Sequence, residues 1–291
     1  MSDAASWIVM DTLELQNKFN RKSFEIAHHL SSHPLLQLPK LMELAERTLR
    51  IRPQDLHYDA GSIRVEQRWD EIPSAPFSPQ EALERIENSG AWVLFRSVQR
   101  DAEYRVLLDH GLAEIKSYLG PTIDSQILVE DVLIFVASPK RVTTYHIDRE
   151  CNFLLHIRGT KTIHVFDRED REVLPEEELE RFWSVDFNAA VYKPQLQHRA
   201  ISYKLAPGIG VHIPVNCPHW IENDDNVSIS LSLNFQLREH LRANIYRANF
   251  LLRQLGFHPT PPGVMPALDA MKAYSVLPAV WAKKTCRRLA P

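Results

Sequence analysis

The sequence is poor in the features that mark secreted, membrane-bound or nucleotide-binding proteins. Its three cysteines, Cys151, Cys217 and Cys286, are an odd number and contain no C-x-x-C pair, which argues for reduced thiols and against a disulfide scaffold. No apolar run approaches the roughly 18 residues that a membrane span requires. The sequence also lacks a G-x-S-x-G motif, a P-loop, a dinucleotide-binding glycine fingerprint and an H-E-x-x-H motif, so the mechanisms that depend on them are not indicated.

Charge of one sign is not in excess either, because 34 lysines and arginines oppose 37 aspartates and glutamates. This balance argues against nucleic acid or a membrane surface as a partner. The basic tail, residues 283–288, is interpreted as a solvated chain end, with a nucleic-acid contact as the alternative. The first residues lack the basic and apolar segments of a signal peptide, so we expect a cytoplasmic protein. A chain of 291 residues is long enough for one or two domains.

The pattern that points to chemistry is His146-Ile147-Asp148 together with a distant histidine, His219. Two imidazoles and one carboxylate form the facial triad that binds non-haem Fe(II) and leaves positions free for oxygen and a co-substrate. Residues i and i+2 of a strand point to the same side, so His146 and Asp148 are expected to reach one metal. The third ligand must then come from another strand, which explains why His219 is distant in sequence.

The surroundings of these residues predict strands rather than surface turns. Apolar and β-branched runs separated by short turns suggest strands at 141–146, 151–158 and 160–166, a short strand after Gly208, and a long strand at 227–235. Along the last strand, apolar residues alternate with Ser228, Ser230, Ser232 and Asn234. This polar face is compatible with a polar cavity or with solvent, and the sequence alone does not separate the two.

The stretch from Ile127 to Phe235 resembles the JmjC-type, cupin-fold oxygenases that depend on Fe(II) and 2-oxoglutarate. Within them it is most similar to the asparaginyl hydroxylase that acts on hypoxia-inducible factor. Beside the three candidate ligands, four residues carry the resemblance. Thr143 lies three residues before the first ligand, Asn152 six after it, Lys161 fifteen after it, and Asn234 fifteen after His219.

The resemblance implies Fe(II), 2-oxoglutarate as co-substrate and O2. Lys161 would bind the far carboxylate of 2-oxoglutarate through a charge-assisted bond, assisted by the Thr143 hydroxyl. Asn152 and Asn234 would donate to the carboxylate at the metal end. An ordinary exposed strand lysine is the alternative for Lys161, and Arg158 is the second candidate cation. The implied reaction is hydroxylation of an amino-acid side chain of a protein, peptide or small molecule, and demethylation uses the same chemistry.

Two other classes of function remain as alternatives. A non-oxidative cupin, either an isomerase or a small-ligand sensor, would keep the metal site but would not need a buried cation at Lys161. A regulatory binding protein ranks last, because the sequence has no accessory reader domain or zinc-ligand cluster. The remaining strand histidines, among them His156, His164, His198 and His212, are interpreted as packed or surface residues, and Trp220 as a core residue with a wall of the site as its alternative.

The expected fold is α+β with a mainly β core, a double-stranded β-helix (jelly roll) of the cupin type flanked by helices. We divide the chain into an N-terminal helical region at 1–124, a catalytic core at 125–237 and a C-terminal helical region at 238–291. Helices are predicted at 12–52, 79–89, 101–119, 175–183 and 238–257, with a strand at 91–95 and an irregular stretch at 53–80. Substrate contacts are expected in the loops at 60–78 and 184–200.

The C-terminal helix has an apolar stripe formed by Leu241, Ile245, Ala248, Leu252 and Leu255. Such a stripe must be covered, either by the barrel or by a second copy of the chain. The hydroxylase that the core resembles dimerises through C-terminal helices, so the resemblance favours a homodimer. Apolar residues at 276–281 would supply a second helix to this interface.

Overall fold

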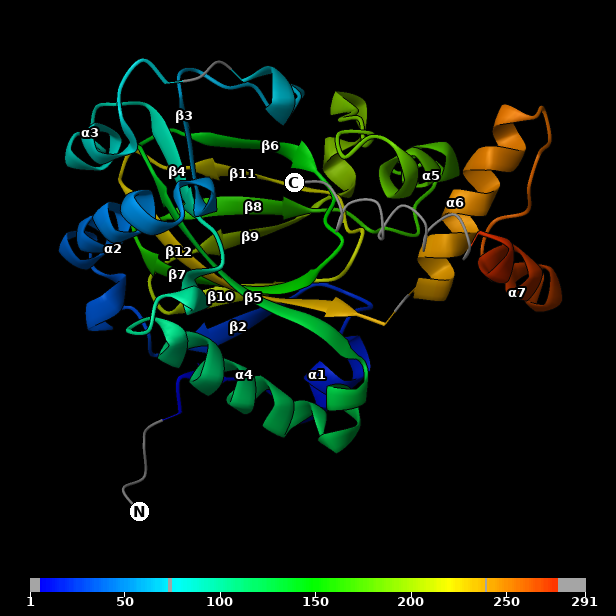
Figure 1. The fold of residues 1–291 in the computed structure, drawn as a ribbon, viewed down its shortest axis with the longest axis horizontal. Coiled ribbons are helices and arrows are strands. Elements are labelled where there is room, and N and C mark those ends of the chain that lie inside the picture. Colours follow the sequence, from blue (N-terminus) through cyan, green and yellow to red (C-terminus); the bar gives the residue numbers. More distant parts are fainter. Residues whose placement is uncertain (1–5, 73–74, 239, 277–291) are drawn as a thin grey trace.

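Two antiparallel sheets face each other at the centre of the protein (Figure 1). The computed structural model describes residues 6–72, 75–238 and 240–276. The strands of the eight-stranded sheet follow in the spatial order β1 (Ile8–Val9), β2 (Phe24–His28), β10 (Ile209–Ile213), β7 (Cys151–Arg158), β12 (Ser228–Leu237), β5 (Ile127–Ala137), β4 (Ala91–Phe95) and β3 (Leu56–Ala60). Those of the four-stranded sheet follow in the order β6 (Val142–His146), β11 (His219–Asn223), β8 (Lys161–Val165) and β9 (Ile201–Leu205).

Strand β12 shows how the sequence pattern builds the centre. It pairs with β5 on one side and β7 on the other, so it lies in the middle of the large sheet. Its apolar residues belong to the main hydrophobic core. Its polar residues Ser228, Ser232 and Asn234 are also buried and line a cavity between the sheets. The alternation therefore separates core from cavity rather than core from solvent.

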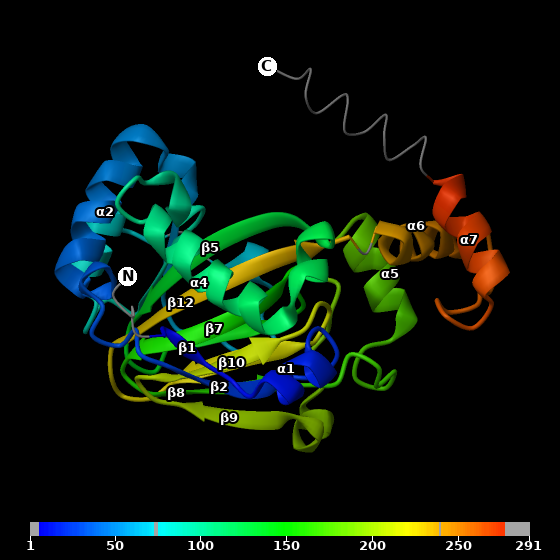
Figure 2. The same ribbon diagram turned by 90° about the horizontal axis from the view of Figure 1, so that it is seen from below.

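The apolar side of the large sheet is covered by helices of the N-terminal region. Helix α4 (Arg105–Leu119) crosses this face near β5 and β12 (Figure 2). It approaches closely, since a Cβ atom at Gly111 would lie 2.7 Å from Leu233 Cδ1. Helix α3 (Pro79–Glu84) begins at a capping box made by Ser78 and Glu81. Helices α3 and α4 and the strand β4 between them confirm the elements predicted there.

The prediction of helix over 12–52 is wrong in its middle. Helices α1 (Thr12–Lys18) and α2 (Leu38–Ile51) lie in this range, but residues 24–28 form β2 and pair with β10. Phe24, Ile26 and His28 are buried and the residues between them exposed, which is the two-residue period of a strand. The leucines that follow have helical spacing, and this spacing does not extend back to Phe24 and Ile26.

The N-terminal region also contributes more strands than expected. Strand β3 lies in the stretch predicted to be irregular and pairs with β4. Strands β1 and β2 extend one edge of the large sheet, while β3 and β4 extend the other. The expected N-terminal helical region is therefore a mixture of helices and sheet extensions.

Helices α5 (Glu176–Ser184), α6 (His240–Gln254) and α7 (Pro266–Ser275) lie at one end of the sheets (Figure 1). α6 packs between α5 and α7. Of the predicted stripe, Ile245 and Ala248 are buried and Leu255 is exposed. The side chain of Leu241 and residues 277–281 lie outside the described part of the chain, as do the basic tail and Cys286. Among the helices that the structure describes, none has both the length and the apolar character needed to span a bilayer.

Candidate metal centre

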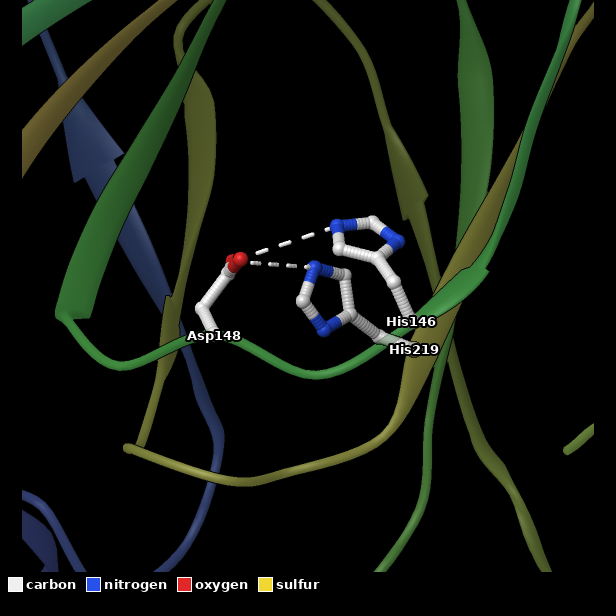
Figure 3. A group of neighbouring side chains, drawn as sticks. All are labelled: His146, Asp148 and His219. Carbon is white, nitrogen blue, oxygen red and sulfur yellow. Dashed lines mark ion pairs between the residues drawn. The ribbon is translucent and has the colours of Figure 1, made fainter. Parts of the chain in front are cut away.

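The structure brings the three candidate ligands together (Figure 3). His146 ends β6 and His219 begins β11, and the two residues are directly opposite in the register of these neighbouring strands. The Asp148 carboxylate lies 3.9 Å from His146 Nε2 and 3.6 Å from His219 Nε2. Donor atoms about 2 Å from one metal ion lie roughly 3–3.5 Å from each other, so this spacing fits a shared ion. Among the described residues, no other group of three or more histidine, cysteine or acidic side chains has such geometry.

Hydrogen bonds orient both imidazoles for a metal. His146 Nδ1 lies 2.7 Å from the Thr144 carbonyl oxygen, and His219 Nδ1 lies 2.9 Å from the Cys217 carbonyl oxygen. Since a carbonyl oxygen only accepts, each Nδ1 carries a proton, and in the neutral form of either ring Nε2 keeps its lone pair. Burial, with a smaller effect of His146, lowers the pKa of His219 to about 4, so this ring is neutral at physiological pH. Neutral imidazoles are what a metal site requires.

The alternation argument for Asp148 holds only in part. β6 ends at His146, so Asp148 lies in the loop before β7 rather than on a strand. The side chains of His146 and Asp148 still converge, because the loop carries Asp148 toward both imidazoles (Figure 3). The direction of the Asp148 carboxylate is therefore determined by the conformation of this loop.

A cavity of about 620 Å³ extends from the metal centre between the two sheets. It is lined by all seven residues singled out in the sequence, which are His146, Asp148, His219, Thr143, Asn152, Lys161 and Asn234. They come from β6, β7, β8, β11, β12 and the loop after β6. The structure thus places in one cavity residues that are up to 91 positions apart in the chain, as the step from Thr143 to Asn234 shows.

Lys161 is buried, with 4% of its surface exposed. Its ammonium donates a 2.7 Å hydrogen bond to Ser230 Oγ, and no carboxylate of the described residues lies within ion-pair distance of it. Burial lowers the pKa of Lys161 to about 7. A buried ammonium without a counter-charge is costly, and an anion in the cavity would offset that cost.

The two asparagines face each other across neighbouring strands, since Asn152 and Asn234 are paired in the register of β7 and β12. Asn234 Oδ1 accepts a hydrogen bond from Ser232, and the buried Asn152 Oδ1 has no partner within the described chain. Such an amide, buried on a cavity wall, is suited to a polar ligand. Thr143 lies on β6 and also lines this cavity.

The competing residues are accounted for by other contacts. Arg158 is exposed at the end of β7. His212 is buried among Phe19, Phe24 and Phe153, and both of its ring nitrogens have backbone partners. His164 stacks on Trp220, and Trp220 packs in a hydrophobic cluster outside the cavity lining. His156 is buried and hydrogen-bonded to Ser230, beside Lys161.

The cavity also has walls that sequence reasoning missed. Trp92 and His57 of β4 and β3 line it, because these strands extend the large sheet beyond β5. The buried ion pair between Asp59 and Arg141 lies on the same wall. The loops in which substrate contacts were expected supply residues as well, Trp69 and Ile72 from one and Phe187 from the other. Nothing local in the sequence marks β3 as a cavity wall.

Neither the protein-family models nor the curated proteins include a match to this sequence. Solved structures do match in fold. A crystal structure of the ribosomal oxygenase YcfD from Escherichia coli has a TM-score of 0.51 at 17% identity, and a structure of YcfD in complex with cobalt and 2-oxoglutarate has a TM-score of 0.53 at 16% identity. Each comparison covers 95% of this chain and 68% of the YcfD chain. A further X-ray structure of YcfD has a TM-score of 0.55 at 16% identity and covers 94% of this chain and 68% of that one. At such identity the likeness shows a shared fold.

Proposed function

We propose that this chain is an Fe(II)- and 2-oxoglutarate-dependent oxygenase of the JmjC type that hydroxylates an amino-acid side chain of a protein, peptide or small molecule. One observation carries the proposal. A convergent set of two histidines and one aspartate opens into the same cavity as a buried ammonium that has no counter-charge among the described residues. The first feature suits iron, and the second suits the far carboxylate of a dicarboxylate that chelates it.

The fold supports this proposal. Going from β5 to β12, successive strands alternate between the two sheets, except that β8 and β9 are neighbours in the small one. Such alternation is the arrangement we expect of a double-stranded β-helix, with the metal at one mouth. The solved structures that share the fold include a ribosomal oxygenase, and one of them is described as a complex with cobalt and 2-oxoglutarate. A protein substrate is accordingly our preferred class, in line with the resemblance to an asparaginyl hydroxylase.

The residues present fit Fe(II). His146 and His219 offer Nε2 atoms, and Asp148 offers a carboxylate that would neutralise part of the metal charge. Bound there with three protein ligands, iron would supply the activation of O2 that is coupled to decarboxylation of 2-oxoglutarate. The carbonyl oxygens of Thr144 and Cys217 keep both rings in the required tautomer.

The wall residues would hold the co-substrate. Lys161 neutralises the far carboxylate and Thr143 donates its hydroxyl hydrogen to the same group. Asn152 and Asn234 donate amide hydrogens to the carboxylate at the metal end. The exposed aromatic residues Trp69 and Phe187 line the cavity and would contact a side chain of the substrate as it enters.

The test is release of succinate from 2-oxoglutarate by the Fe(II)-loaded protein, without added substrate and with peptide libraries. We expect turnover that increases with a true substrate and a product heavier by one oxygen atom. Loss of a methyl group from the substrate would indicate demethylation instead. Asp148→Ala removes one of three protein ligands, so it should abolish succinate release and lower metal occupancy while the fold is kept.

Two results would contradict the proposal. If Asp148→Ala released succinate at the wild-type rate, the ligand assignment would be wrong. If calorimetry detected no 2-oxoglutarate binding to the wild-type Mn(II) form, the oxygenase would give way to a non-oxidative metal-binding cupin.

A further inference from the structure

The Asp148 carboxylate is a metal ligand that no neighbour fixes directly. Within the described chain, the polar side-chain partners of this carboxylate are the two ligand histidines, and the Asp148 side chain is 36% exposed. It lies on the loop between β6 and β7, where no sheet hydrogen bonds define its direction. The position of this carboxylate must therefore come from what anchors the loop backbone.

Both neighbours of Asp148 in the sequence are anchored on or beside α5. Ile147 is buried in a cluster with Leu179 and Phe182. Arg149 donates a 2.8 Å hydrogen bond to the Phe182 carbonyl oxygen, and its guanidinium carbon lies 4.9 Å from the ring centroid of Trp183 and 4.3 Å from that of Phe187. The aromatic contacts and the hydrogen bond together restrain the planar guanidinium of Arg149, and a lysine ammonium would be restrained less.

A second connection joins Trp183 to both metal-binding loops. The backbone N–H of Asn216 donates to the Asp148 carbonyl oxygen at 3.0 Å. The Asn216 side-chain oxygen in turn accepts a 3.1 Å hydrogen bond from Trp183 Nε1. Asn216 is buried, has a left-handed φ of 61°, and precedes His219 by three residues. It therefore lies between the loop of Asp148 and the corner that leads to His219.

Helix α6 also contacts Trp183. Arg247 donates to the Trp183 carbonyl oxygen at 3.1 Å, and its guanidinium carbon lies 5.7 Å from the Trp183 ring centroid. Arg253 adds a bidentate ion pair to the buried Glu180 of α5, with N–O distances of 2.7 and 2.9 Å. The C-terminal helix is thus connected to Asp148 by a continuous chain of contacts through α5.

We propose that Trp183 and Arg149 are positioning residues for the metal site, which aim Asp148 and set the affinity for the divalent ion. They act through the loop backbone and through Asn216 rather than by touching the metal. This inference deepens the proposed function and rests on its metal centre. Outer contacts of this kind typically change metal affinity by about 10- to 100-fold when they are removed.

The test is Mn(II) affinity of the whole protein, measured from free Mn(II) by electron paramagnetic resonance, with the visible spectrum of the Co(II) form as a second readout. Trp183→Phe keeps the ring for both arginines but removes the Nε1 donor to Asn216. We expect its Mn(II) dissociation constant to rise about tenfold and its Co(II) spectrum to change. The matched control is Trp7→Phe, since Trp7 stacks on His110 of α4, away from the cavity lining.

A double-mutant cycle isolates the hydrogen bond from Trp183 Nε1 to the Asn216 side-chain oxygen. Asn216→Gly tolerates the left-handed φ but lacks the acceptor, so it should weaken Mn(II) binding about as much as Trp183→Phe. Combining the two should add little. Wild-type affinity in Trp183→Phe, or full additivity in the double variant, would overturn the assignment of this bond.

If circular dichroism shows that Trp183→Phe does not fold, Arg149→Lys decides. It keeps the charge but loses the planar contact and the fixed donor, so weaker Mn(II) binding is expected and wild-type binding overturns the proposal. The proposed function fails separately. A wild-type protein that binds Mn(II) but neither binds nor decarboxylates 2-oxoglutarate would remove the oxygenase and leave the positioning role in place.

Discussion

Lys161 is a buried cation, and no anion of the described residues neutralises its charge. Its partner in the described chain is the hydroxyl of Ser230, and its cavity also contains the candidate metal ligands. A cation kept in this state costs folding free energy, because the ammonium is desolvated without an opposing charge. We therefore interpret the residue as maintained for binding rather than for stability.

Replacement of Lys161 by alanine tests this interpretation. Losing a charge-assisted bond in a shielded site costs about 1.5–3 kcal/mol, which corresponds to a fall of about ten- to a hundredfold in 2-oxoglutarate affinity. Mn(II) affinity should stay nearly unchanged, because Lys161 is not a ligand. Calorimetry on the Mn(II) form measures both quantities. The control is Lys204→Ala on the neighbouring strand β9, where the side chain is exposed, and equal 2-oxoglutarate affinities in the two variants would exclude the assigned role.

The binding of 2-oxoglutarate should also depend on pH. Burial lowers the pKa of Lys161 to about 7, and only the protonated ammonium attracts a carboxylate. Below pH 7 the charge is already present. Above pH 7, binding of 2-oxoglutarate requires that Lys161 take up a proton, so the affinity should fall by up to about tenfold per pH unit. This fall continues until the pH reaches the pKa of Lys161 in the complex, which the bound carboxylate raises.

The neighbouring groups do not interfere with this experiment. Burial, followed by the charge of Lys161, lowers the pKa of His156 to about 3, so this ring stays neutral in the range tested, and Ser230 does not titrate. The measurement is the dissociation constant of 2-oxoglutarate at saturating Mn(II), from about pH 6 to about pH 9, which gives the slope of affinity against pH. In Lys161→Ala the slope should disappear. An equal slope in both proteins would assign the effect to another group.

The part of the site that the sequence could reveal was the part with fixed spacing. His146 and Asp148 are two residues apart, and Lys161 and Asn234 are each fifteen residues from a ligand, so a pattern can capture them. Trp183 and Asn216 were not found, because their contact depends on how α5 packs against the loops. Ser230 was seen only as one of several polar residues on a strand, and its hydrogen bond to Lys161 needs the register of the two sheets.

At the scale of elements, the turn that connects β7 of the large sheet to β8 of the small sheet places Lys161. Its turn residue, Gly159, has a φ of +82°, and a Cβ atom there would clash with Asn226 Oδ1 and the Val227 carbonyl oxygen. Gly256 follows α6 with a similar φ of +86° but has open space around it. A comparison of alanine variants at the two glycines therefore distinguishes the cost of backbone strain from the cost of steric overlap.

Alanine at both positions makes a matched comparison. Gly256→Ala should cost about 1–2 kcal/mol from the left-handed backbone alone. Gly159→Ala should cost roughly 1–3 kcal/mol more, because the backbone at Val227, just before β12, must also move. Thermal denaturation followed by circular dichroism gives the order of the two melting temperatures. Gly159→Ala should also bind 2-oxoglutarate more weakly, and equal melting temperatures would show that the turn can adapt.

Elements with a consistent period were predictable, and the failures come from mixed periods. The sequence around 91–95 and 105–119 carries one clear pattern for each element, and β4 and α4 form there. Residues 24–28 alternate like a strand, but they lie next to leucines with helical spacing. Strand β2 pairs with β10, about 180 residues away, and no local pattern encodes that partner.

At the scale of the whole molecule, α6 and α7 form a pair that lies beside the sheets rather than over them (Figures 1 and 2). The inner side of α6 is covered by the rest of the protein, because Ile245 and Tyr246 are buried. Large apolar residues of the pair and of the segment after α6 remain exposed, namely Leu251, Leu255, Phe257, Met271 and Tyr274. If these residues form one continuous apolar surface, that surface would be expected to take part in an interface.

A second copy of the chain is our prediction for what covers this surface, since a two-fold contact is self-complementary and needs no other partner. Light scattering at micromolar concentration should give twice the 33.6 kDa of one chain. Leu255→Glu places a charge on a side chain that is 74% exposed here, so it should reduce the mass to that of a monomer without unfolding the protein. Leu13→Glu on α1, 70% exposed and on another part of the molecule, should leave the dimer intact. A wild-type mass of one chain would refute the dimer and would leave another partner, or the chain beyond residue 276, to cover the helices.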